Sequence, residues 1–180
     1  MSGGINAWEA KTAVGPQDLG MELFENLENP LHILITAYSL EQGLQTFYDD
    51  LGKQADNQKV RELFSALSRI EVKHMASIYA AYSEISTEAI SQTELEKQVE
   101  TTALEGGLSI HEYMERFGSD LKEEIQVISM AMSIEAQALD LYQRLSLTLS
   151  NPGSRKIVNQ IADEEKKHLV SLGRLMDNVQ

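Results

Sequence analysis

Apolar residues recur at helical spacing along most of the chain after Asn29. Asn29 and Pro30 form a helix start signal, an Asn cap followed by Pro at the first helical position. The apolar positions that follow are mostly three or four residues apart, which predicts a first long helix that ends near Gly52. Its apolar stripe contains Leu34, Ala37, Tyr38, Leu44 and Tyr48.

Three further long helices follow from the same spacing. Turn and capping residues separate them. A shorter additional helix is predicted within residues 17–27. The predicted bounds are Asp56 or Asn57 to about Glu84 for the second helix, a start near Ser119 and Asp120 for the third, and a start at Ser154, after the turn Asn151-Pro152-Gly153, for the fourth.

The segment between the second and third helices is long enough to set the topology. It contains the capping-box pattern Ser109-Ile110-His111-Glu112, which predicts one or two short helices. Short turns make the first and second helices one antiparallel pair and the third and fourth another, whereas this segment can run the length of a helix of ~40 Å. Two hairpins joined by one long crossover form a ferritin-like four-helix bundle, so we expect an all-α fold of that class.

Composition narrows the function classes. The net charge of −13 repels phosphate backbones and argues against a nucleic-acid partner. No apolar run reaches the ~18 residues of a membrane helix, and no signal-peptide core follows the N-terminus, so we expect a cytoplasmic protein with no membrane partner. The chain has no cysteine, which excludes disulfides, iron–sulfur clusters and thiol nucleophiles within it. Any metal must therefore be held by His and carboxylates.

The two predicted hairpins repeat each other without a gap at an offset of 94 residues. A repeat within one chain predicts two related halves packed about a pseudo-twofold axis. The identical pairs are Ser39/Ser133, Glu41/Glu135, Tyr48/Tyr142, Leu51/Leu145, Arg61/Arg155, Glu71/Glu165, Lys73/Lys167, His74/His168 and Ser77/Ser171.

Glutamates of this repeat lie on the apolar stripes of all four helices, and two helices add a histidine three residues further on. Residues three apart share a helix face, so each Glu-x-x-His pair aims a carboxylate and an imidazole at one point. Burying an ionised carboxylate costs several kcal/mol, and four together repel one another. Two divalent cations would compensate them; the donor set suits iron or manganese, with zinc as a further candidate. The six predicted ligands are Glu41, Glu71, His74, Glu135, Glu165 and His168.

As a joint pattern, these six residues resemble the ferritin-like superfamily and, within it, the rubrerythrins, over about residues 30–178. The resemblance implies two iron ions, with Glu71 and Glu165 as bridging carboxylates and no catalytic residue beyond the metal ligands. It also implies reduction of peroxide or dioxygen with electrons from an external donor such as a rubredoxin-like protein. Typical rubrerythrins carry a further Glu where this chain has Ala138, so its ligand set is the six-residue one shared with bacterioferritins.

Two other functions stay open at this point. One is a ferroxidase, iron-storage or iron-handling protein. The other is a non-enzymatic, metal-stabilised partner module of a sulfurtransferase. Pairing of bundle faces into a homodimer is also open.

Two tyrosines and the N-terminal residues complete the predictions. Tyr48 and Tyr142 lie seven residues beyond Glu41 and Glu135; they either border the metal site or are core tyrosines with backbone partners. Residues 17–180 are predicted to form the bundle, and residues 1–16 a tail or linker. Within that tail, Gly3-Gly4-Ile5-Asn6-Ala7-Trp8 resembles the closing segment of a rhodanese-like domain, which implies such a domain upstream; a disordered leader explains the composition equally well.

Overall fold

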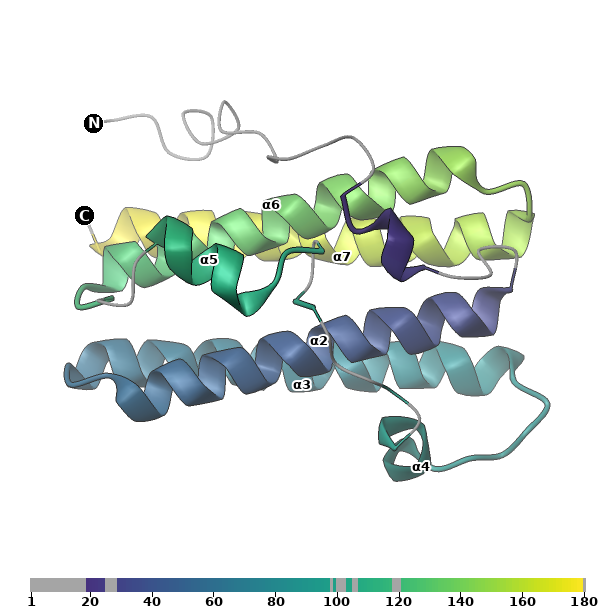
Figure 1. The fold of residues 1–180 in the computed structure, drawn as a ribbon, viewed down its shortest axis with the longest axis horizontal. Coiled ribbons are helices and arrows are strands. Elements are labelled where there is room, and N and C mark those ends of the chain that lie inside the picture. The colour runs from purple at the N-terminus through teal and green to yellow at the C-terminus, as the bar shows by residue number, and fades with distance from the viewer. Residues whose placement is uncertain are drawn as a thin grey trace.

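The four long helices form two antiparallel hairpins that lie side by side (Figure 1). The computed structural model describes residues 19–24, 29–97, 99, 103–104, 107–117 and 121–179. No strand occurs in these ranges, so the prediction of an all-α ferritin-like bundle is confirmed. In chain order the elements are the 3₁₀ turn η1 (Met21–Leu23) and the helices α2 (Pro30–Gln54), α3 (Gln58–Ile85), α4 (Gln92–Glu96), α5 (Ile110–Phe117), α6 (Glu124–Thr148) and α7 (Pro152–Val179).

The internal repeat is visible in the helix bounds. Pro30–Gln54 of α2 corresponds to Glu124–Thr148 of α6 at the offset of 94 residues seen in the sequence. The same offset relates Gln58–Ile85 of α3 to Pro152–Val179 of α7. The α2–α3 turn and the α6–α7 turn lie at opposite ends of the bundle (Figure 1), so the two halves run in opposite directions, as a pseudo-twofold axis across the bundle requires.

Local capping chemistry explains where the helices begin. The side chain of Asn29 accepts a hydrogen bond from the Leu31 amide at 3.0 Å, and Asn57 does the same for the Lys59 amide at 2.9 Å. The Asn151 side chain accepts from the amides of Gly153 and Ser154. Each cap satisfies amides of the first turn that have no partner within the helix.

Arginines reach back across both interhelical turns. Arg61 donates to the carbonyl of Ala55, the residue that ends α2, at 2.8 Å. Its repeat mate Arg155 donates to the carbonyl of Leu149, which ends α6. A carbonyl in the last turn of a helix lacks an intrahelical donor, so these two contacts complete the helix ends and fix the turns.

The crossover runs the length of the bundle, as expected, and contains two short helices, α4 and α5. Ser109 and Glu112 form the predicted reciprocal contacts at the start of α5. Leu104, Leu108 and Tyr113 are buried and anchor the crossover to the core.

Three predicted boundaries need correction. The third long helix begins at Glu124, not near Ser119 and Asp120, because Glu123 and Gln126 form a capping box there. The fourth begins at Pro152 rather than Ser154. Residues 17–27 contain only a 3₁₀ turn in their described part, and the rhodanese-like resemblance of residues 1–16 lies outside the described residues. None of the helices described here combines the length and apolarity needed to cross a bilayer.

The hydrophobic core is divided into two clusters along the bundle axis. One contains Leu34, Tyr38, Ile78 and Tyr142, and the other contains Leu44, Phe64, Ile128 and Leu172 among its members. In every long helix, the predicted metal ligands fall in sequence between the residues of these two clusters. The fold therefore places a polar layer across the middle of an apolar bundle.

Candidate metal centre

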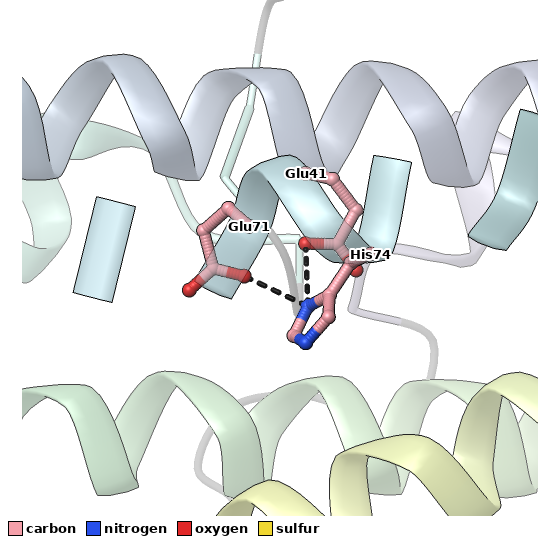
Figure 2. A group of neighbouring side chains, drawn as sticks. All are labelled: Glu41, Glu71 and His74. Carbon is pink, nitrogen blue, oxygen red and sulfur yellow. Dashed lines mark hydrogen bonds and ion pairs between the residues drawn. The ribbon is translucent and has the colours of Figure 1, made fainter. Parts of the chain in front are cut away.

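The six predicted ligands form two matching groups in this polar layer. Glu41 of α2 lies with Glu71 and His74 of α3, and their ligand atoms are within 4.8 Å of one another. Figure 2 shows these three side chains converging below their helices, toward the second hairpin. The repeat mates form the equivalent group, Glu135 of α6 with Glu165 and His168 of α7.

In each group the histidine presents Nδ1 to two carboxylates. His74 Nδ1 lies 2.8 Å from Glu71 Oε2 and 3.3 Å from Glu41 Oε2 (Figure 2). His168 Nδ1 lies 3.2 Å from its helix neighbour, Glu165 Oε2, and 3.5 Å from Glu135 Oε2. The i, i+3 spacing on α3 and α7 brings the imidazole to the carboxylate of its own helix, and packing of the hairpin supplies the second carboxylate.

The two groups adjoin each other across the bundle. The rings of His74 and His168 stack with their centroids 3.8 Å apart and an interplanar angle of 8°. The charge of Glu135 also acts on Glu71, which belongs to the other group. The six side chains therefore form one centre with two halves rather than two remote sites.

Burial makes this centre costly without a compensating charge. The four glutamates are each at most 2% exposed, and His74 is 7% exposed. His168 is the most accessible of the six, with 20% of its side chain exposed. Buried carboxylates in an apolar interior are expected to be paired, protonated or bound to a metal.

The protonation of the metal-free centre reflects this cost. Burial, reinforced by the charges of Glu41 and Glu135, raises the pKa of Glu71 well above its usual value, although its contact with His74 opposes the shift. Burial alone would lower the pKa of His74, but its hydrogen bonds with Glu41 and Glu71 raise it to about 11. In the metal-free centre, bound protons therefore offset part of the negative charge that metal cations would offset when bound.

Burial also acts to raise the pKa of Glu135. Hydrogen bonds with His168 and Glu165, together with the charges of both histidines, outweigh burial and hold this pKa below its usual value. In the metal-free centre the carboxyl group of Glu71 therefore tends to stay protonated, whereas that of Glu135 tends to stay ionised. Proton sharing of this kind is expected where several carboxylates occupy one buried site.

The residues fit a pair of metal ions. Protein oxygen and nitrogen ligands lie about 2.0–2.2 Å from a transition metal, so two ligands of one ion are separated by about 3.0 Å at a right angle and about 3.5 Å at the tetrahedral angle. Three of the four Nδ1–carboxylate distances, 3.2–3.5 Å, fall in this range, and the fourth, 2.8 Å between His74 and Glu71, is slightly shorter. In addition, Oε1 of Glu71 is buried and has no hydrogen-bond partner among the described residues. Each group therefore offers converging ligand atoms. In the group of Glu41, Glu71 and His74, a metal ion would also satisfy the unpartnered Oε1 of Glu71.

A groove gives access to the centre from one side. It lies between α3 and α7 and encloses about 460 Å³. His74, His168 and Glu135 line it together with apolar side chains of both helices. The sequence predicted the ligands but not this opening, since a groove arises from the distance between two helices and not from the pattern on either.

The two tyrosines and the alanine singled out in the sequence are all fully buried. Tyr48 and Tyr142 are fully buried, Tyr48 with its ring centroid 6.2 Å from that of Phe64 and Tyr142 in edge-on contact with Phe24 at 6.0 Å. Their proposed role beside the centre stays a prediction. Ala138 is fully buried one turn beyond Glu135, so that position adds no carboxylate.

The family model described as Rubrerythrin matches residues 32–176, a stretch that contains all six converging residues. Comparison with curated proteins and with solved structures gave no significant match.

Proposed function

Because this chain belongs to the rubrerythrin family, we propose that its six converging side chains hold two iron ions, or one iron and one manganese, and that the protein reduces peroxide or dioxygen with electrons from an external donor. One observation carries the proposal: two buried Glu-Glu-His groups meet at the stacked rings of His74 and His168. That arrangement favours two adjacent ions over one. Imidazole and carboxylate donors suit iron and manganese.

Adjacent redox-active metals supply, when bound, the two electrons that cleavage of an O–O bond consumes. The protein's own contribution is to hold the ligands and to limit access. Glu71 and Glu165, one on each Glu-x-x-His helix, are the proposed bridging carboxylates. The apolar clusters on both sides of the polar layer exclude water along the bundle axis, so oxidant enters through the groove between α3 and α7.

Electrons must come from outside this chain. It has no cysteine and therefore no rubredoxin-type iron site of its own. A separate redox protein or an attached redox domain is the proposed donor. A rhodanese-like domain upstream remains part of this proposal on the sequence resemblance of residues 3–8 alone.

The test is metal analysis followed by oxidation and turnover. Protein loaded anaerobically with ferrous iron should hold two ions per chain, develop a ferric absorption spectrum on addition of hydrogen peroxide, and consume peroxide catalytically when a chemical reductant is supplied. Protein stripped with a chelator is the control. Uptake of many more than two irons per chain would identify iron storage instead, and two tightly held ions that never change oxidation state would identify a structural metal module.

A further inference from the structure

The groove over the centre is large and mostly apolar on one side. At one end of the groove, α3 and α7 contribute six apolar residues to its lining. The rest of the lining is polar: four residues of the centre, together with Lys73, Ser77, Glu164, Lys167 and Ser171. We call the apolar end the apolar arm. Its apolar residues are Leu63, Ala66, Leu67, Ile70, Leu172 and Leu175.

A second hollow adjoins the first along α3 and α7, on the side away from the apolar arm. It also encloses about 460 Å³ and shares Ser77, Glu164 and Lys167 with the first. Its lining contains six apolar side chains as well, but it adds three acidic residues and an amide, and we call it the polar arm. These polar residues are Glu84, Gln160, Asp163 and Glu164.

The internal repeat breaks at the groove. Gln160 of the polar arm is the repeat mate of Ala66 in the apolar arm, and Glu164 is the repeat mate of Ile70. The ligands beneath the groove are identical in the two halves. The two halves of the bundle therefore carry the same predicted ligands but different side chains along the groove above them.

The size of the groove exceeds what a small oxidant needs. One water in the liquid fills about 30 Å³, and hydrogen peroxide and dioxygen are of similar dimensions. The whole groove of about 460 Å³, in which leucines line one end and polar groups the other, is as large as the pockets that hold organic ligands.

We propose that the apolar arm binds the alkyl or aryl group of a neutral organic hydroperoxide and thereby directs its O–O bond to the metal centre. This inference rests on the proposed function and names its substrate class. Contact with leucine side chains stabilises each buried methylene group. The groove carries charges of both signs, with Lys73 and Lys167 beside its acidic residues, so its charge selects no ionic substrate and its apolar side chains are left to recognise a neutral group.

The reaction balances with the electrons already invoked. The hydroperoxide ROOH takes up two electrons and two protons; its O–O bond breaks, the oxygen bound to carbon leaves as the alcohol ROH, and the other leaves as water. Two metal ions held by the six side chains would supply these electrons, one each, on going from the divalent to the trivalent state. The external donor, or a chemical reductant in the assay, returns the two electrons.

The first experiment compares peroxides on the iron-loaded protein. Single-turnover oxidation is followed by stopped-flow absorbance with hydrogen peroxide and with neutral n-alkyl hydroperoxides of increasing length. The second-order rate constant should rise about threefold per added methylene until the arm is full. Ala66→Trp should abolish this dependence on chain length. Gln160→Trp, which places the same bulk at the repeat-related position, should retain the dependence.

The second experiment measures binding without turnover. Zinc-loaded protein is titrated with the corresponding n-alkyl alcohols, and binding is followed by ligand-observed NMR. Affinity should also rise about threefold per methylene, be lost in Ala66→Trp and persist in Gln160→Trp. Circular dichroism and metal content of both variants establish that the bundle and the centre are intact, and Ala76→Trp on the exposed face of α3 controls for added surface bulk.

The outcomes separate the two proposals. If hydrogen peroxide oxidises the centre but alkyl chain length changes neither rate nor binding, the substrate assignment is wrong and the proposed function stands. If no peroxide oxidises the iron, the proposed function fails, whatever the alcohols do. If Ala66→Trp converts a dimer into a monomer, a second copy of the chain covers the groove and the substrate assignment is overturned.

Discussion

The imidazole rings of His74 and His168 stack 3.8 Å apart at an angle of 8°, each with Nδ1 facing the carboxylates of its own half. Two protonated rings in this arrangement would repel each other in a buried setting. Metal ions bound at both Nδ1 atoms leave the rings neutral, and neutral rings can stack. The contact therefore joins the two halves of the centre and favours its metal-bound form.

Removal of the proposed bridging carboxylates should empty the centre. In the double variant Glu71→Ala with Glu165→Ala, affinity for both metals should fall by more than about 100-fold, since loss of groups that merely orient a ligand already costs about 10–100-fold. Metal analysis after dialysis measures the effect. Glu164→Ala, which removes a carboxylate beside Glu165 in the sequence, should keep two metals per chain. Unchanged affinity in the double variant would show the ligand assignment to be wrong.

Chelation should lower thermal stability. A ligand present at a thousand times its dissociation constant stabilises the folded state by about 4 kcal/mol, and for a domain of this size each kcal/mol shifts the melting temperature by about 2–4 °C. We therefore expect Tm to fall by about 10 °C or more when metal is removed. Calorimetry of the loaded and chelated protein measures it. The same chelator should leave Tm of the Glu71→Ala and Glu165→Ala double variant unchanged.

Glu71→Gln should separate function from stability. Burial raises the pKa of Glu71, so the charged carboxylate is unfavourable in the metal-free bundle. A neutral amide of nearly the same shape should make the metal-free protein as stable as wild type or more stable, while metal binding weakens. Urea unfolding of chelated protein tests the first part and metal titration the second. A large loss of metal-free stability would contradict the expected cost of this buried carboxylate and indicate that it stabilises the bundle.

Metal binding should depend strongly on pH. In the metal-free protein the pKa of His74 is about 11, so this ring carries its proton at pH 7 and an incoming metal must displace it. Below that pKa, affinity rises about tenfold per pH unit for each proton displaced. We expect tighter binding at pH 8 than at pH 6, with proton release. Calorimetric titrations in two buffers of different ionisation enthalpy count the protons, and binding that is independent of pH would refute this assignment.

The paired arginines should stabilise the two turns independently. Arg61→Ala and Arg155→Ala each remove a donor from a helix-terminal carbonyl and should cost about 0.5–1.5 kcal/mol. The turns lie at opposite ends of the bundle (Figure 1), so the losses should add in the double variant. Urea unfolding measures the free energies, with exposed Lys166→Ala as a control. A double variant no less stable than either single one would show that the two contacts are coupled.

The pattern of the chain was sufficient to predict the four helices and the convergence of the six side chains. Helical spacing of apolar residues defined the helices, and glutamates on apolar stripes could be stable only if their charge was compensated. The repeat carried further information: the start of the first helix at Pro30, moved by 94 residues, gives Glu124, where α6 begins. The prediction near Ser119 and Asp120 relied on capping preference alone, which is weaker than the repeat.

The amino-acid sequence by itself determined the composition of the centre, because a carboxylate three residues from a histidine must share its helix face wherever that helix packs. Tertiary structure alone decided how far apart the four helices lie. That separation stacks His74 on His168 and opens the groove between α3 and α7, where the repeat mates Ala66 and Gln160 face different arms. Distances between helices depend on the packing of all four at once, so no local pattern specifies them.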